Sequence, residues 1–222
     1  MELLVVIAIL GALVALGTGA YQTSLRKSKQ AGCAGNMRNI AVAMTLYAQE
    51  NNGRLPETTH TASIQNAWIY QLEEHIGKFD ETRVCPADPK KAARLAARGS
   101  SYILNSFVFV PQHDAFGSPI GRPMNNLYAI EEPSRTLMCV VCADSVGVAP
   151  GNDHTHSEMW NSWAAVRRDV ATDRHGTPTP EGTKGGSNYL YFCGRVAYIE
   201  GAKLREMIAR GENPAQPPGL KL

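Results

Sequence analysis

Residues 3–20 read LLVVIAILGALVALGTGA, eighteen consecutive residues without a charged side chain. As an α-helix rising 1.5 Å per residue, this run is about 27 Å long, close to the roughly 30 Å hydrocarbon core of a bilayer. A buried helix of a globular domain is a poorer explanation, because a helix that is apolar on all sides needs a large core to cover it. The run therefore predicts a helix that lies in a membrane or in the core of a filament.

The main alternative for this run is a cleaved secretory signal, which would leave a secreted monomer that begins after Ala20. Such signals start with basic residues, whereas Glu2 precedes this run. Basic residues follow it instead, at positions 26, 27 and 29. Taken alone, that cluster would lie in the cytoplasm by the positive-inside rule, and a basic segment ahead of the run would reverse this orientation. We therefore favour a retained helix.

Beyond Tyr21 the helix is predicted to continue with a different surface. Apolar side chains recur at spacings of four, three, four and three, namely at Cys33, Met37, Ile40, Met44 and Tyr47. That period places one apolar stripe on a helix, with polar residues between. The sequence Asn51-Asn52-Gly53 is a helix stop, and Pro56 opposes continuation. Residues 2–50 are thus expected to form one helix about 70 Å long.

The rest of the chain predicts a head with both helices and strands. Strand-like runs lie at 102–110, 137–143 and 189–199, and short helical patterns lie at 68–76, 90–98 and 203–210. The basic segment 90–98 is expected to be a solvated surface. The predicted fold class is α+β, a long N-terminal helix packed on a small antiparallel β-sheet head.

This pattern divides the chain into four parts. They are the membrane or filament-core half of the helix (1–25), its amphipathic half (26–52), an α+β globular head (53–210) and a loose proline-rich tail (211–222). The formal net charge of the 222 residues is only +2, so no nucleic-acid partner is expected, because such proteins need a strongly basic face. The sequence has no Gly-x-Ser-x-Gly and no phosphate-binding glycine loop. We therefore expect the protein not to be an enzyme.

Several ordered segments resemble a known family. The start of the chain, MELLVVIAIL with Glu2, is similar to the mature N-terminus of type IV pilins and type II secretion pseudopilins, which carry a prepilin-type N-terminal methylation motif. Further segments resemble a pseudopilin-like bacterial group with a C-terminal processing-associated domain. They are KQAGC (29–33) with NMRNIA (36–41), CPADP (85–89), SYILN (101–105), EPSRT (132–136), and RHG (174–176) followed by SNYLYFCGRV (187–196).

The resemblance implies a structural subunit that polymerises through its N-terminal helix into a filament of a type IV pilus or a type II secretion-like machine. Its partners would be other copies of itself, other pilins, a prepilin peptidase and an assembly platform. The helix would cross the bacterial inner membrane once before assembly, with the head in the periplasm or outside the cell. Glu2 would direct assembly, because a lone carboxylate at the edge of an apolar span is costly unless it is paired.

Five cysteines are present, at positions 33, 85, 139, 142 and 193. Disulfides are permitted if the head lies outside the cytoplasm. Cys33 on the helix and Cys85 in a Cys-Pro turn would join helix and head, and the closed loop would contribute about 3–4 kcal/mol by the chain-entropy estimate. Cys139 and Cys193, in strands that we expect to be neighbours, are further disulfide candidates. The alternative for the last three cysteines is that they are small buried apolar residues.

Acidic residues and histidines gather in one polar region, at Asp144, Asp153, His154, His156, Asp173 and His175. His154 and His156 offer two ligands for Zn²⁺, with an aspartate to complete the site. The aspartates would also suit Ca²⁺, although polar loops collect such residues for turns as well. We expect no cofactor to be required. The alternative function is a membrane-anchored metal-binding protein or hydrolase that uses the loop of His154 and His156.

Overall fold

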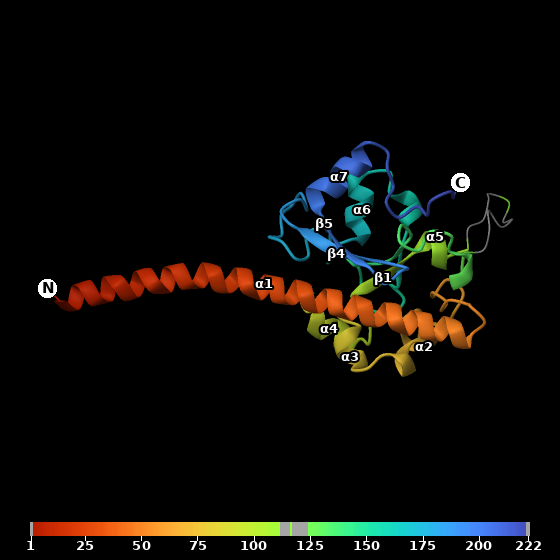
Figure 1. The fold of residues 1–222 in the computed structure, drawn as a ribbon, viewed down its shortest axis with the longest axis horizontal. Helices are drawn as coiled ribbons and strands as arrows, with labels where there is room; N and C mark the ends of the chain where they lie inside the picture. Colours follow the sequence, from red (N-terminus) through yellow and green to blue (C-terminus); the bar gives the residue numbers. More distant parts are fainter. Residues whose placement is uncertain (1, 112–115, 117–123, 221–222) are drawn as a thin grey trace.

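The structure is a computed structural model that describes residues 2–111, 116 and 124–220, with the side chains of 2–4, 8, 10 and 12–17 left out. Its longest element is α1 (Glu2–Glu50), a single helix of 49 residues as predicted. The helix ends where the sequence indicates, because Asn52 and Gly53 adopt positive φ values of 55° and 84° and the Gly53 amide donates to the Ala48 carbonyl at 2.7 Å. Figure 1 shows α1 projecting far beyond the head, with the N-terminus at its distant end.

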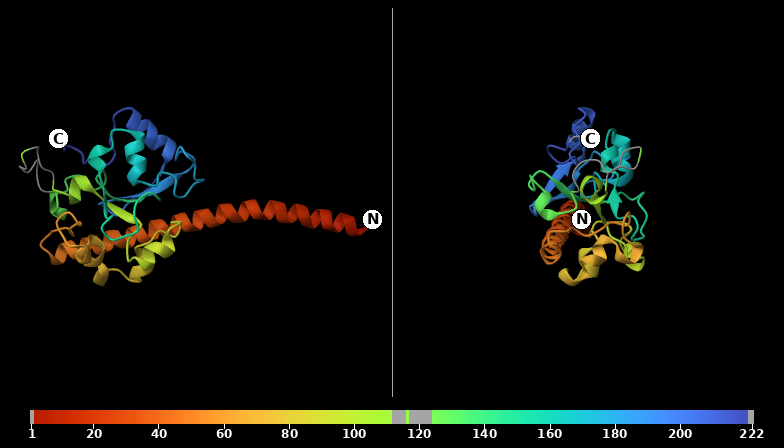
Figure 2. Two further views of the ribbon diagram at one scale, coloured as in Figure 1. Left: turned by 180° about the vertical axis from the view of Figure 1, so that it is seen from behind. Right: turned by 90° about the vertical axis from the view of Figure 1, so that its right-hand side faces the viewer.

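Only the C-terminal part of α1 is packed into the head. Five residues on one stripe are completely buried, namely Cys33, Met37, Ile40, Met44 and Ala48. The contact begins near Gln30, whose carbonyl accepts a hydrogen bond from the Asn188 amide at 2.9 Å. Described residues between Val5 and Lys29 are exposed, and the left-hand view in Figure 2 shows this half of the helix clear of the head.

The head contains a five-stranded sheet with the order β3-β1-β2-β4-β5. Its strands are β1 (Tyr102–Asn105), β2 (Leu137–Val141), β3 (His154–Thr155), β4 (Gly186–Tyr191) and β5 (Val196–Glu200). β2 is antiparallel to β1 and to β4, and β4 is antiparallel to β5. We had expected a purely antiparallel sheet, and this was wrong. The sheet is mixed, because the long 142–153 connection brings β3 back beside β1 in the same direction.

Each face of the sheet is covered by helices. α1 and the small helices beside it pack on one face, where the buried side chains include Cys139 and Val141 of β2. The opposite face, with Val140, packs on α6 and α7. The short helices are α2 (Trp68–Gln71), α3 (Phe79–Thr82), α4 (Lys91–Ala96), α5 (Ser106–Phe109), α6 (Trp163–Asp169) and α7 (Gly201–Ala209). Single 3₁₀ turns are η1 (Ile64–Asn66), η2 (Glu73–His75), η3 (Leu127–Ala129) and η4 (Ser157–Met159).

Three local predictions differ from the structure. The run 102–110 is a strand only to Asn105, whose side chain then accepts from the Phe107 amide at 3.2 Å and starts α5. The segment 90–98 is not wholly a solvated surface, because the Arg94 side chain is buried. The tail is not loose over its described part, since Ala215 is buried and its carbonyl accepts from the Asn105 amide at 2.8 Å.

Candidate functional site

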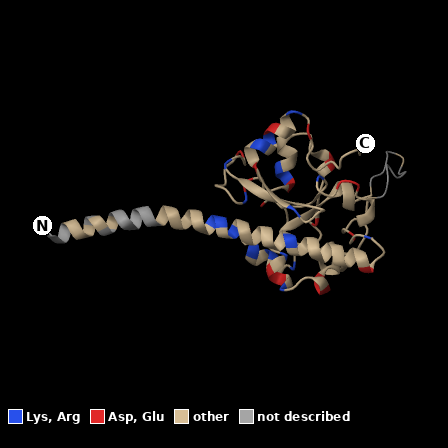
Figure 3. Ribbon diagram, in the orientation of Figure 1, with Lys and Arg blue, Asp and Glu red and all other residues tan. Residues whose placement is uncertain are grey.

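The projecting half of α1 is the most unusual surface of the molecule. Val5, Ile7 and Ile9 are 56%, 58% and 54% exposed. Figure 3, in which lysine and arginine residues are blue, shows that the first of them on the helix occur close to the head. The sequence has no charge from residue 3 to residue 25. A long apolar surface of this kind marks a place where other molecules pack. Among the residues that the structure describes, no helix combines the length and apolarity that crossing a membrane requires.

A second site lies on the head, where three imidazoles from two distant segments meet. His154 in β3 and His156 directly after it project from the same side of the strand, as residues two apart do. The turn at residues 58–61 places His60 against His154, with ring centroids 4.4 Å apart, and the His154 and His156 rings are 5.2 Å apart. One ring nitrogen of each histidine lies within 4.8 Å of the others.

Asp153 positions two parts of this cluster. Its carboxylate contacts Nδ1 of His154 at 2.7 Å and accepts from the backbone amide of Thr59 at 2.8 Å and from the Thr59 hydroxyl at 3.1 Å. The His154 side chain is only 9% exposed, and its Nε2 is buried without a hydrogen-bond partner among the described groups. The ring is therefore held in one orientation, with a nitrogen left available.

His156 also lies beside a carboxylate. Its Nδ1 is 3.6 Å from Asp169, which accepts from the His156 amide and the Thr155 hydroxyl at 3.0 Å each. Burial alone would raise the pKa of Asp169, but these hydrogen bonds and Arg168 hold it below its usual value. Burial and the neighbouring imidazoles lower the pKa of His60. Imidazoles held beside carboxylates have the chemistry of a metal site.

A different cluster joins α1 to the head. The sulfur atoms of Cys33 and Cys85 and a ring nitrogen of His175 all lie within 4.8 Å of one another, and all three residues are buried. Nε2 of His175 is 3.9 Å from Sγ of Cys85. The hydrogen bond with Cys85 lowers the pKa of Cys33 against the effect of burial. The same hydrogen bond, together with burial, raises the pKa of Cys85. The two cysteines are free thiols here, in a set that suits a disulfide or a soft metal ion.

His175 reaches this cluster because of the glycine that follows it. A Cβ at Gly176 would lie 2.2 Å from the Lys184 carbonyl oxygen, so only glycine allows the two segments to approach this closely. The His175 amide donates to the Gly186 carbonyl at 2.9 Å, which fixes the segment against β4. The predicted polar region is therefore divided. His175 lies with the cysteines, whereas His154 in the edge strand β3 and His156 directly after it belong to the other cluster.

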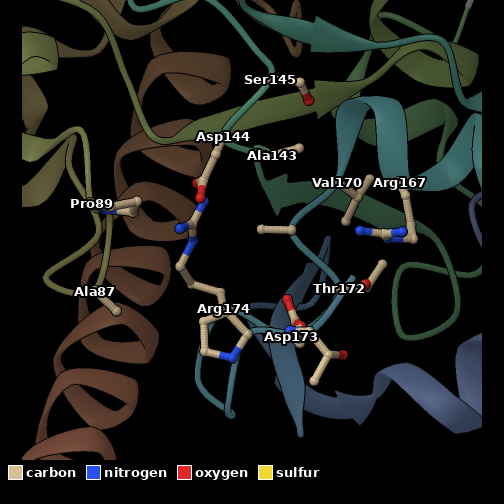
Figure 4. A pocket seen from close by; sticks show the side chains of 13 residues that line it. Ala87, Pro89, Ala143, Asp144, Ser145, Arg167, Val170, Thr172, Asp173 and Arg174 are labelled. Atoms are coloured by element: carbon tan, nitrogen blue, oxygen red, sulfur yellow. The ribbon is translucent and has the colours of Figure 1, made fainter. Parts of the chain in front are cut away.

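Asp144 and Asp173 lie in a third place, beside a cavity of about 390 Å³. Figure 4 shows Arg174 extended toward Asp144 along this cavity, and its Nη2 donates to that carboxylate at 2.6 Å. Asp173 accepts from the Thr179 amide at 3.0 Å. These two aspartates are thus engaged with groups of their own and are not brought to His154 and His156.

The remaining cysteines do not form a cluster. Cys139 is completely buried in β2 opposite Leu190, whereas Cys193 is exposed in the turn between β4 and β5. Cys142 is buried just after β2. The structure therefore does not bring Cys139 and Cys193 together.

His60 is the one cluster member that sequence reasoning missed. It is 94 positions before His154 and has no spacing pattern with it (154 − 60). The alternation of side chains in a strand puts both rings of a His-x-His sequence on one side, so it indicates His154 and His156 but not His60.

Comparison of the chain with protein-family models, with curated proteins and with solved structures finds no match.

Proposed function

We propose that this protein is a filament subunit of the pilin or pseudopilin type, which assembles with further copies of itself through α1. The observation that carries the proposal is the N-terminal half of α1, which is apolar and, where described, exposed in the single chain. Burying one Val or Ile side chain contributes about 1.5–3 kcal/mol. A row of such residues therefore gives a strong driving force for helix association.

The helix also offers places for close packing. A Cβ at Gly11 or Gly19 would meet nothing within 4 Å, so the backbone of a neighbouring helix has room to approach there. Small residues at helix interfaces allow this kind of contact. Because the packing of α1 on the head begins at Gln30, the described residues of the apolar half stay accessible to neighbouring subunits.

The remaining parts of the proposal follow from the resemblance of the N-terminal sequence to pilins. The helix would reside in the bacterial inner membrane before assembly, and a prepilin peptidase and an assembly platform would act on the chain. Glu2 would pair with a positive group of a neighbouring subunit, which offsets the cost of a carboxylate next to an apolar surface. The head would then be displayed outside the filament core.

Replacement of Glu2 by alanine tests the assembly role. We expect Glu2→Ala to abolish filaments in the cells that make the protein, while the head keeps its circular dichroism spectrum and melting temperature. Glu206→Ala, on the exposed surface of α7, is the matched control and should leave filaments unchanged. Normal filaments from the Glu2→Ala variant would contradict the assembly role of this residue.

A further inference from the structure

We propose that His60, His154 and His156 bind one Zn²⁺ ion, with a fourth coordination position open to solvent. One ring nitrogen of each already lies within 4.8 Å of one ring nitrogen of the other two. With Zn–N bonds of 2.0–2.1 Å, a tetrahedral ion holds its nitrogens about 3.4 Å apart. Closing the site therefore shortens these separations by up to about 1.4 Å, and His60 and His156, which supply two of the three rings, are exposed.

His154 is the ligand that is already in place. Its Nδ1 is occupied by Asp153 at 2.7 Å, which leaves Nε2 as the coordinating nitrogen. That atom is buried and has no hydrogen-bond partner among the described groups. An unsatisfied buried polar atom costs about 1–3 kcal/mol. A bond to a metal ion removes this cost, so the unpartnered nitrogen is independent support for a ligand at this point.

Carboxylates behind the imidazoles complete the arrangement. Ligating histidines in metal sites commonly donate their other N–H to a carboxylate, which fixes the tautomer and makes the imidazole a better ligand. Asp153 does this for His154, and Asp169 lies 3.6 Å from Nδ1 of His156. Asp153 also holds Thr59, the residue before His60. The same carboxylate therefore positions both segments that contribute ligands.

The donor set favours Zn²⁺ over Ca²⁺, because imidazole nitrogens suit zinc whereas calcium takes oxygen ligands. Three protein ligands leave one tetrahedral position for water, and the exposure of His60 and His156 places that position toward solvent. Water on such an ion has a pKa of about 7, so the bound ion would carry hydroxide near neutral pH. None of the three histidines lies on α1, and the metal site is independent of the proposed assembly.

Zinc titration of the full chain tests this site. The protein, without an affinity tag, is solubilised in detergent, stripped with a chelator and titrated with zinc chloride. We expect one Zn²⁺ per chain. His60→Ala and His156→Ala should each weaken binding by more than 10-fold, and Asp153→Asn by about 10–100-fold. His75→Ala, a histidine that pairs with Glu50 at 3.3 Å outside the cluster, is the control and should bind as the unaltered chain does.

Cobalt substitution separates this site from the thiol cluster at Cys33 and Cys85. Co²⁺ bound by three histidines gives a tetrahedral visible spectrum without the sulfur-to-cobalt charge-transfer band that thiolate ligands produce. The proposal is overturned if the unaltered chain binds no zinc at micromolar concentration. It is overturned equally if His60→Ala and His156→Ala bind zinc unchanged, or if binding is lost in Cys85→Ser and the cobalt spectrum shows the sulfur band. Melting temperatures of each variant exclude loss of folding as the cause.

Discussion

Arg94 and Asp88 form an ion pair that is almost completely removed from water. Nε of Arg94 donates to the Asp88 carboxylate at 2.7 Å, and the two side chains are 1% and 0% exposed. Asp88 also accepts from the Ser101 hydroxyl at 2.6 Å and the Lys90 amide at 2.8 Å. This network closes the turn that begins at Cys85, so it positions the cysteine next to α1.

The first prediction concerns Asp88 and pH. Burial raises the pKa of Asp88, but Ser101, Arg94 and the Lys90 amide more than offset this and hold it below its usual value. Because the folded-state pKa is the lower one, the stability from Asp88 is complete above about pH 4 and is lost as the pH falls through the folded-state pKa. Asp88→Asn should cost about 3–5 kcal/mol at neutral pH, since it leaves Arg94 buried without its partner.

Urea unfolding of both proteins between neutral and acidic pH measures this effect. The difference in unfolding free energy should shrink as the pH falls below about 4. A difference that stays constant with pH would show that the carboxylate is not the source of the stability. Glu212→Gln, in an exposed pair with Arg210, is the control and should cause no measurable change.

The second prediction concerns how α1 is fixed to the head. Ile40 is completely buried, whereas Val42, two residues further along, is 58% exposed. Ile40→Ala should lower the unfolding free energy by about 2–5 kcal/mol, because it leaves a cavity in the core. Val42→Ala should change it by less than about 0.5 kcal/mol. Equal effects of the two substitutions in urea unfolding would mean that the helix does not pack as described.

The third prediction concerns the N-terminal half of α1. A shortened chain that begins at Gln30 should fold and remain monomeric, because packing against the head begins at that residue. Its melting temperature should match that of the head in the full chain, and it should sediment as a single species. The full chain should associate in the absence of detergent. A shortened chain that unfolds would show that the projecting residues support the head.

The fourth prediction concerns Cys33 and Cys85. Oxidised glutathione should convert the two thiols to a disulfide, with the electrons passing to glutathione disulfide, which leaves as two glutathione thiols. The Cys33 and Cys85 pair should lose two hydrogen atoms, and the protein should gain about 3–4 kcal/mol of stability. Reductant should reverse both changes, and Cys33→Ser should remove the response. The control is Cys193→Ser, because Cys193 is exposed in a turn. This variant should form the Cys33–Cys85 disulfide as the unaltered chain does.

A tightly held zinc ion at Cys33, Cys85 and His175 that prevents oxidation would contradict this prediction. Metal analysis before and after the glutathione treatment distinguishes the two results. The mass of a peptide that contains both cysteines identifies the bond directly.

The sequence predicted the features that depend on local periodicity. The extent of α1 follows from its apolar run, from the stripe of apolar residues that includes Ile40, and from the stop at Gly53. The end of β1 was missed, because the cap at Asn105 depends on a side-chain hydrogen bond that no hydrophobic pattern records. The parallel pairing of β3 was missed as well, since it depends on the path of a long connection.

The candidate site was less accessible to sequence reasoning. His154 and His156 stand out because they are two residues apart, but His60 joins them only through tertiary structure. Asp144 and Asp173 looked equally suited to a metal and instead lie beside Arg174 and Thr179. Residue type and proximity in sequence therefore indicated the chemistry but not the set of ligands.

The central claim is that the protein assembles through α1. It is tested most directly by electron microscopy of material sheared from the surface of the cells that make the protein, together with mass spectrometry of the subunit. The account predicts filaments built from chains that retain residues 3–20. Absence of filaments, together with a mature chain that starts after Ala20, would contradict it.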